Sequence, residues 1–510
     1  MKSTRLRDAV SGALAAGLAL GVSELLAGLI AAVPSLVESL GNWVIDNVPP
    51  PVKEWAISVF GTNDKLMLLL GITVVTLLFG ALVGVLARKR FVVAVVVFVA
   101  FGVLAALAAA LDPQVSLGVA AVPAGAAVLA GLATLRMLYR ISEPGPGAAA
   151  AADKSKRDFL IGVGAVLAVA ALAGTVGRAL VESAKRAVAG REEVDLPSPA
   201  EALPPVAEPA DFGIDGVEPI LVPNEDFYRI DTALSIPRID LQEWTLSVTG
   251  MVDRPYTIDF SDLLDMRMVE RDITLSCVSN QVGGGLVGNA RWLGVPLTEI
   301  LDRAGVQPGA EQMVGRSVDD FTVGFPVSAA YDGREALVAV GMNGEPLPFE
   351  HGFPARLVVA GLYGYVSATK WLSAIELTTW DGFDAYWVPR GWAKEAPIKT
   401  QSRIDTPGHS TQIEAGRHVV AGVAWAPTRG ISKVEVQLGE DQPWVEAELS
   451  EPLSENAWVQ WRVDWDASEA GRHFLSCRAT DGEGELQTDE LRPPAPDGAT
   501  GWHQRPVFVV

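Results

Sequence analysis

Long apolar runs dominate the first 190 residues and constrain the fold more than any other feature. Five of them, at 11–33, 65–87, 91–111, 115–138 and 159–180, are each close to the length that a helix needs to cross a bilayer. We therefore predict an N-terminal all-α transmembrane bundle of five helices over residues 1–190. The segment 40–60 contains two tryptophans and three prolines, and it is predicted to lie at the membrane interface or to form a re-entrant turn.

Basic residues orient these helices. They cluster before the first run, between the second and third, and between the fourth and fifth: Lys2, Arg5, Arg7; Arg88, Lys89, Arg90; Arg136, Arg140, Lys154, Lys156, Arg157. Segments rich in Lys and Arg beside membrane helices remain in the cytoplasm, so the chain beyond the fifth helix is expected on the outer side of the membrane. This predicts a multi-pass cell-membrane protein, in contact with membrane lipid, whose large domain is extracytoplasmic.

The apolar region lacks the residues that intramembrane chemistry needs. All five histidines lie at position 351 or beyond, so a bis-histidine haem cannot form in the bilayer and no haem is expected in this chain. Glu24 is the one acidic candidate for an ion pathway in the first four helices. An anchor or a platform for a partner is therefore favoured over a transporter.

Composition changes sharply after the fifth helix. Residues 191–218 are rich in Pro, Glu and Ala and are predicted to be a linker. Residues 1–193 carry 17 Lys and Arg against 13 Asp and Glu, whereas the remainder carries 23 against 48. Such an acidic domain argues against nucleic acid as a partner.

The acidic part has two patterns. Residues 219–400 mix short strands and helices, as in an α+β domain, with a strand at 244–249 and a helix at 258–266 that Ser261 would cap. Residues 401–510 contain strands separated by turns, which is typical of a β-sandwich. The sequence therefore predicts three domains joined by one linker.

Cys277 is the first candidate for chemistry. It ends an alternating strand and precedes Asn280 and the run Gly283–Gly285, a loop able to bring its backbone close to a ligand. Such a thiol can coordinate a soft metal, although a small buried hydrophobe is the alternative. Cys477 lies on a predicted core strand 200 positions away, so both cysteines are expected to be unbridged.

Four motifs in order resemble the sulfite oxidase family of molybdopterin enzymes. They are NEDFYRIDTAL at 224–234, LSCVSN at 275–280, ARWLGVPL at 290–297 and HGFPARLVVAGLYGYVSATKW at 351–371. The resemblance extends over about residues 210–510. It implies a molybdopterin-binding catalytic domain at 219–400, an immunoglobulin-like dimerisation domain at 401–510, and a homodimer.

The resemblance also implies roles for individual residues. Cys277 matches the thiolate ligand of molybdenum, and Arg229 matches the arginine directed at the substrate oxygen, with a surface salt bridge as its alternative reading. Trp292 matches the tryptophan that lines the substrate pocket. The matches to cofactor-binding positions are Asn224, Tyr228, Ser317, His351, Arg356, Thr369 and Lys370.

Two departures from the family pattern concern the substrate. The family's C-A-G-N-R-R run is CVSNQV here, so the paired arginines are missing. Trp392 occupies the place of the family's catalytic tyrosine, and Tyr386 is the nearest phenol, so both are catalytic candidates. Both changes favour a substrate that is less anionic than sulfite.

Residues 155–160, SKRDFL, resemble the twin-arginine export signal with lysine in place of the first arginine. An ordinary basic flank of a membrane helix is the alternative reading. A molybdopterin enzyme receives its cofactor in the cytoplasm while it folds. Export of an already folded domain is therefore the expected route.

These features together predict a membrane-anchored molybdenum oxidoreductase. It would transfer an oxygen atom, with two electrons, to or from a small sulfur or nitrogen oxo compound, and exchange electrons with a separate cytochrome, cupredoxin or quinol-linked protein. One alternative is a true sulfite oxidase that passes electrons to an external cytochrome or cupredoxin. Another is a noncatalytic membrane-anchored adhesion or sensor module, against which the joint presence of Cys277, Arg229, His351, Arg356 and Lys370 argues.

Overall fold

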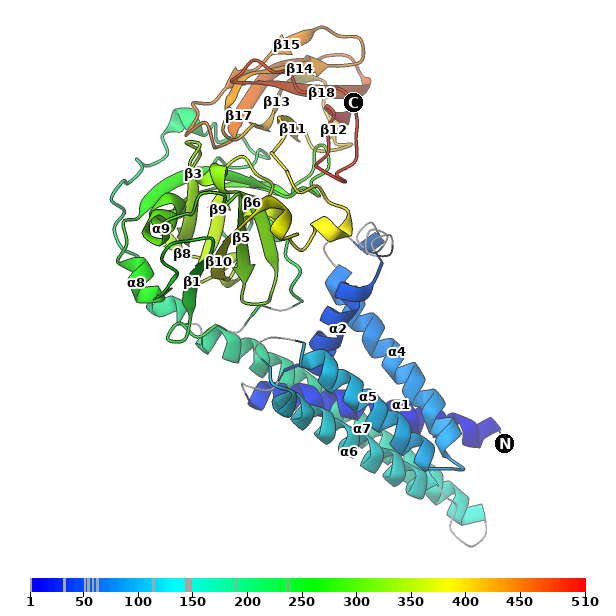
Figure 1. The fold of residues 1–510 in the computed structure, drawn as a ribbon. Coiled ribbons are helices and arrows are strands. Elements are labelled where there is room, and N and C mark those ends of the chain that lie inside the picture. The colour runs from blue at the N-terminus through cyan, green and yellow to red at the C-terminus, as the bar shows by residue number, and fades with distance from the viewer. Residues whose placement is uncertain are drawn as a thin grey trace. The chain divides into compact units, whose positions relative to one another are not determined.

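The computed structural model of the chain describes residues 2–30, 34–49, 52, 56, 59–60, 64–111, 115–142, 149–188, 190–234, 236–237 and 239–510. These residues form two compact units (Figure 1). The N-terminal unit comprises Met1–Ala189 with Ala233–Arg238, and the C-terminal unit comprises Gly190–Thr232 with Ile239–Val510. Lys65 Nζ donates a hydrogen bond to Ala233 O (2.6 Å), which holds the short segment 233–238 within the N-terminal unit.

The N-terminal unit is built from helices (Figure 1). Five are long and apolar enough to cross a membrane, over Arg5–Leu29, Lys65–Ala87, Val92–Ala109, Leu117–Ser142 and Lys156–Val181, which confirms the five predicted apolar helices. The described elements are α1 (Lys2–Leu29), α2 (Leu36–Asn47), α4 (Asp64–Ala87), α5 (Val92–Ala109), α6 (Leu117–Ser142) and α7 (Ala149–Val188). Residues 40–47 of the predicted interfacial segment belong to α2, and seven of the 21 residues at 40–60, including Trp55, lie outside the described residues.

A polar cluster joins α1, α2 and α7. Ser35 Oγ donates to Glu24 Oε1 (2.6 Å) and accepts from Glu38 N (3.2 Å), and Arg178 forms an ion pair with Glu38. Glu24, the acid that the sequence singles out, is therefore hydrogen-bonded. This pairing is what buried polar groups require, and it supports a structural role for the cluster.

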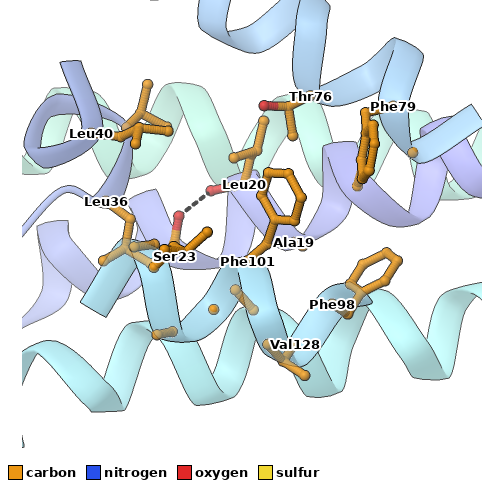
Figure 2. Close-up of a pocket in the computed structure, with 18 of the residues that line it drawn as sticks. Ala19, Leu20, Ser23, Leu36, Leu40, Thr76, Phe79, Phe98, Phe101 and Val128 are labelled. Carbon is orange, nitrogen blue, oxygen red and sulfur yellow. Dashed lines mark hydrogen bonds between the residues drawn. The ribbon is translucent and has the colours of Figure 1, made fainter. Parts of the chain in front are cut away.

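The N-terminal unit also contains an apolar cavity of about 170 Å³ lined by residues of α1, α2, α4, α5 and α6 (Figure 2). Its two lining hydroxyls bond to carbonyls of their own helices, Ser23 Oγ to Leu20 O and Thr76 Oγ1 to Ile72 O. No ionisable side chain is among the lining residues. The cavity therefore has no group suited to redox or acid–base chemistry.

The first part of the C-terminal unit is β-rich, with only short helices, so its helical share is smaller than the α+β prediction implies (Figure 1). One sheet has the order β2 (Tyr256–Asp259), β1 (Thr245–Gly250), β10 (Leu372–Thr378), β5 (Gln312–Ser317) and β6 (Thr322–Pro326). The other has the order β3 (Val269–Ser276), β4 (Val287–Pro296), β7 (Ala336–Met342) and β8 (Glu345–Pro346), with β9 (Arg356–Val359) paired to β7. The helices are α8 (Phe260–Leu264), α9 (Leu297–Ala304) and α10 (Gly364–Ser367).

The start of α8 corrects one prediction from the sequence. The cap is Asp259 rather than Ser261, because the Asp259 carboxylate accepts from Asp262 N (2.8 Å) and also from Ser261 Oγ (2.9 Å). Asp262 completes a capping box by accepting from Asp259 N. The helix begins at Phe260, two residues after the predicted start at 258, and the residues before it belong to β2.

Two further sheets form residues 401–510. One has the order β11 (Gln401–Thr406), β13 (Gly416–Trp425), β17 (Val459–Ala467) and β16 (Glu448–Leu449). The other has the order β12 (Gln412–Ile413), β19 (His503–Val509), β18 (Gly471–Asp481), β14 (Ile431–Leu438) and β15 (Trp444–Glu446). Their inner residues share one core that contains Trp461 and the free thiol of Cys477. Cys477 is therefore a packing residue.

The predicted linker, 191–218, lies along the C-terminal unit instead of extending freely into solvent. Arg191 donates to Pro346 O and Leu347 O, Ala200 N donates to Met268 O (2.8 Å), and Phe212 N donates to Gln460 Oε1 (2.7 Å). An extended proline-rich chain makes few hydrogen bonds within itself, so its N–H and C=O groups can bond to neighbouring loops and strands. This contact could not be read from composition.

Candidate active site

Cys277 immediately follows β3 in a tight turn. Its N–H donates to Leu286 O (2.9 Å), and its carbonyl accepts from Asn280 N (3.0 Å). The side chain is only 7% exposed and is not in a disulfide. Burial raises the pKa of the Cys277 thiol, while hydrogen bonds from Ser279 and the charge of Lys370 act in the opposite direction. A bound cation would stabilise the thiolate in place of the proton.

The loop after Cys277 packs against the C-terminal sheets. Gly283 has a φ of +74°, and a Cβ there would overlap the ring of His503. Arg403 Nη1 donates to Gly284 O (3.0 Å). The sequence predicted that these glycines bring the backbone close to a ligand, but at Gly283 the close neighbour is a histidine of β19.

His503 is held neutral. Its Nδ1 accepts from Ile404 N (2.9 Å), so this nitrogen carries no proton. Burial, followed by the charges of Arg505 and Arg403, lowers the pKa of His503 to about 3. An uncharged, buried ring therefore supports the loop that follows Cys277.

The motif at 351–356 brings His351, Arg356 and Lys370 together. Gly352 has a φ of +110°, and a Cβ there would lie 3.0 Å from Lys370 Cβ and 3.2 Å from Arg356 Cβ. His351 Nε2 donates to Asn224 O (3.1 Å), and His351 O accepts from Arg356 Nη1 (3.0 Å). Burial and the neighbouring cations lower the pKa of His351 to about 3, so it is a neutral imidazole whose Nδ1 can accept a hydrogen bond.

Arg356 is a buried cation without a carboxylate partner among the residues that the structure describes. It is 4% exposed and its hydrogen-bond acceptors are the carbonyls of His351 and Leu357. Its guanidinium carbon lies 5.0 Å from the centre of the Trp292 ring, and no salt bridge involves it among the described residues. Burial lowers the pKa of Arg356 to about 10. A buried, uncompensated charge is costly and is typical of a site for an anion.

A second set of charges meets at Asp231, a residue that the sequence analysis did not single out although it lies within the FYRID motif. Asp231 Oδ2 accepts from Arg229 Nε (2.9 Å) and from Lys370 Nζ (3.1 Å). The Asp231 side chain is 6% exposed, whereas that of Arg229 is 40% exposed. Burial lowers the pKa of Lys370 to about 8, while Asp231 opposes this shift. The Arg229 side chain is therefore partly exposed to solvent, although the Asp231 carboxylate that it contacts is buried.

Asn224 and Tyr228 lie beside this group. The Asn224 amide bonds to Met342 O (3.2 Å) and to Asn343 Nδ2 (2.9 Å), so its side chain already has partners. The Tyr228 ring stacks on Phe227 at 5.2 Å between centres. Burial chiefly raises the pKa of the Tyr228 phenol, with Cys277 raising it further and Arg356 lowering it. Tyr228 is therefore close enough to both to be influenced by their charges.

Three of the expected contact residues are deeply buried. Trp292 is 0% exposed, and its Nε1 donates to Ile273 O (3.1 Å), so it lies under Arg356 with its N–H already used. Thr369 is 0% exposed, and its hydroxyl has no hydrogen-bond partner among the described residues. Ser317 Oγ accepts from Asp319 N (3.4 Å) in the loop between β5 and β6.

Trp392 and Tyr386, the two catalytic candidates, belong to an aromatic group with Trp387. Ring centres lie 6.3 Å apart for Trp387–Trp392 and 5.1 Å apart for Tyr386–Trp387. Arg390 stacks on Tyr386 at 3.7 Å and donates to its carbonyl (2.6 Å). Tyr363 is a further phenol that the sequence analysis missed within its fourth motif. Burial, together with lesser effects that include Cys277, raises the pKa of Tyr363 to about 12.

Residues 233–387 match the family model for the oxidoreductase molybdopterin binding domain. Mitochondrial sulfite oxidase of Rattus norvegicus is 27% identical over 325 residues, which cover 54% of this chain and 59% of the rat protein. Nitrate reductase [NAD(P)H] of Hordeum vulgare is 26% identical over 320 residues, covering 50% of this chain and 36% of the barley protein. The chain thus aligns with less than two thirds of each relative's length.

Among solved structures, the sulfane dehydrogenase SoxCD of Paracoccus pantotrophus matches with a TM-score of 0.49 and 23% identity. That match covers 57% of this chain and 81% of the other.

Proposed function

Because the chain is a member of the sulfite oxidase family of molybdopterin-dependent oxidoreductases, we propose that it transfers an oxygen atom, together with two electrons, to or from a small oxo compound. We assign this reaction to the C-terminal unit, at an extracytoplasmic site anchored by the five apolar helices. When bound, the molybdenum centre would supply the redox chemistry and the exchangeable oxygen. The residues of this chain would hold the cofactor and orient the substrate.

The buried guanidinium of Arg356 is the observation that carries the proposal. A cation that is 4% exposed and has only carbonyl partners needs an anion, and the phosphate of molybdopterin would supply one. Lys370 adds a second cation and the neutral His351 adds a hydrogen-bond acceptor at Nδ1. These residues therefore fit the cofactor by charge and hydrogen-bonding chemistry.

Cys277 fits the metal. A single thiol that is 7% exposed, on a turn fixed by hydrogen bonds to Leu286 and Asn280, suits one thiolate bond to molybdenum. Arg229 would direct its partly exposed guanidinium to the substrate oxygen and stabilise negative charge there. Tyr228 and Tyr363, which are influenced by the charge of Cys277, are the phenols that we assign to the surroundings of the metal.

Neutral S-oxides or N-oxides are the substrates that this charge pattern favours. Gln281 and Val282 stand where the family pattern has two arginines, so positive charge is missing next to Cys277. Arg390 is not available as a substitute, because its guanidinium stacks on Tyr386 and donates to that residue's carbonyl. A doubly charged anion needs more cationic partners than this arrangement provides.

The remaining parts of the proposal concern the whole protein. The positive flanks of the apolar helices support a cytoplasmic N-terminus and an external C-terminal unit. Electrons would pass to or from a separate cytochrome, cupredoxin or quinol-linked protein. The two packed sheets of residues 401–510 support an immunoglobulin-like domain, which we assign to homodimerisation.

Metal analysis tests the enzyme assignment. Full-length protein made in a host that synthesises molybdopterin should contain about one molybdenum per chain. Cys277→Ser should lose activity, while Cys477→Ala, at the other buried free thiol, should retain metal and activity. Absence of molybdenum from the parent protein would refute the proposal.

A substrate panel tests the proposed substrate class. The loaded protein is assayed with sulfite and ferricyanide, and separately with neutral sulfoxides and N-oxides and a reduced viologen. We expect better turnover of the neutral oxides and loss of that activity in Arg229→Met. Efficient sulfite oxidation that depends on Arg229 would instead establish the alternative, a true sulfite oxidase.

A further inference from the structure

We propose that Asp231 sets the substrate charge class of this site, by neutralising Arg229 and Lys370 so that uncharged oxo compounds are accepted and dianions are rejected. This inference rests on the proposed function. It assigns a specificity-determining role to a residue of the FYRID motif for which the family resemblance implies no role, and the geometry around one carboxylate oxygen supports it.

That oxygen is shared between two cations. Asp231 Oδ2 accepts from Arg229 Nε at 2.9 Å and from Lys370 Nζ at 3.1 Å, and the carboxylate is nearly buried. A charge in this position is poorly screened by solvent, so its effect on neighbouring groups is larger than that of a surface acid. Arg229, which we assign to the substrate oxygen, and Lys370, which we assign to the cofactor, are therefore both already paired with this carboxylate.

The surrounding charges reinforce this balance. Arg356 lies deeper and is assigned to the cofactor phosphate, and His351 is neutral, so neither adds free positive charge at the substrate side. Asp319 is also close enough for the charge of Asp231 to act on it, and burial chiefly raises its pKa. The charged groups around Arg229 therefore include acids as well as bases, whereas a site for a dianion would be lined mainly by cations.

Asp231→Asn is the informative substitution. An amide keeps the size of the side chain, and its oxygen can still accept a hydrogen bond, but the negative charge is lost. One full charge removed several ångströms from a partly buried ligand should strengthen dianion binding about 10- to 100-fold. Asp231→Glu, which keeps the charge, should behave like the parent.

The first measurement is equilibrium binding of sulfate and of dimethyl sulfone to molybdenum-loaded protein. These ligands share a tetrahedral sulfur with oxygens but differ in charge, and neither requires turnover. Asp231→Asn should bind sulfate about 10- to 100-fold more tightly than the parent, with sulfone binding changed less than about threefold. Asp332→Asn is the matched control. Asp332 pairs with Arg334 at the surface, and its substitution changes the net charge of the protein by the same amount.

The outcomes separate this inference from the proposed function. Unchanged sulfate binding in loaded Asp231→Asn, or an equal gain in Asp332→Asn, would overturn the role of Asp231 while leaving the enzyme assignment intact. If Asp231→Asn fails to load molybdenum, the test uses the parent protein alone. The inference requires the parent to bind dimethyl sulfone at least tenfold more tightly than sulfate. The opposite order in the parent would overturn the inference. Lack of molybdenum in the parent would instead refute the proposed function.

Discussion

Replacing Arg356 with methionine should stabilise the cofactor-free protein or leave its stability unchanged, while abolishing retention of the cofactor. The fully buried guanidinium has a pKa lowered from 12.5 to about 10. Each pKa unit corresponds to about 1.4 kcal/mol, so the charge costs about 3 kcal/mol in the folded state. The folded state binds this proton more weakly than the unfolded state, so the full cost is present at every pH below about 10.

Losses offset part of this gain. Methionine cannot donate to His351 O or Leu357 O, and it gives up the cation–π contact with Trp292. Two hydrogen bonds contribute about 1 kcal/mol each and the cation–π contact about 0.5 to 1 kcal/mol, which leaves a net change of about 0 to 1 kcal/mol in favour of the variant. For a domain of this size, that is an increase of up to several degrees in Tm.

The assay compares thermal unfolding of full-length protein from a host that cannot make molybdopterin. Arg403→Met is the matched control, since Arg403 is equally buried but pairs with Asp405 and Glu218. Removing it leaves carboxylates unpaired and should cost about 3 to 5 kcal/mol. If Arg356→Met lowers the Tm as much as Arg403→Met, or still retains molybdopterin from a competent host, the reasoning is wrong.

Three further predictions concern the buried histidines, the Cys277 loop and topology. Between pH 6.5 and about 3, unfolded chains bind protons that His351 and His503 exclude when folded, so the free energy of unfolding falls as the pH falls; urea unfolding should show a smaller fall for His503→Asn than for the parent, and an equal fall would contradict this reasoning. Gly283→Ala should lower the Tm and the molybdenum occupancy, because the added Cβ would overlap the His503 ring. Gly391→Ala, which also has a positive φ but has open space around it, should retain the metal. Equal losses in the two variants would contradict a supporting role for the Gly283–His503 contact. Reporters fused after Leu111 and at the C-terminus should appear outside and one at Gly147 inside, and a C-terminus protected from external protease would overturn the orientation.

Features set by local pattern were predictable from the sequence. The five apolar helices follow from run length alone, because a bilayer core demands about 20 apolar residues. The strand at 245–250 and the strands of residues 401–510 follow from alternation. The α8 cap shows the limit of this reasoning: Ser261 and Asp259 are both good caps, and only the backbone decided for Asp259.

Contacts between distant parts of the chain could not be predicted. Motif matching brought His351, Arg356 and Lys370 to attention, but it gave no reason to expect that Asp231 joins Arg229 to Lys370. The packing of Gly283 against His503, 220 positions later, has no local signature either. Burial was equally hidden, since nothing in the sequence indicates that the Trp292 ring lies beneath the guanidinium of Arg356.

The contact between Gly283 and His503 has a consequence for the order of events in the cell. Gly283, in the turn that presents Cys277, rests on His503 of β19, which lies 220 positions further along the chain. The cysteine therefore cannot reach its final setting before His503 has been synthesised and packed, and we expect insertion of molybdenum to wait for that contact. A chain truncated before Arg403 would lack both supports of this loop, so we expect such a chain to fail to load the metal.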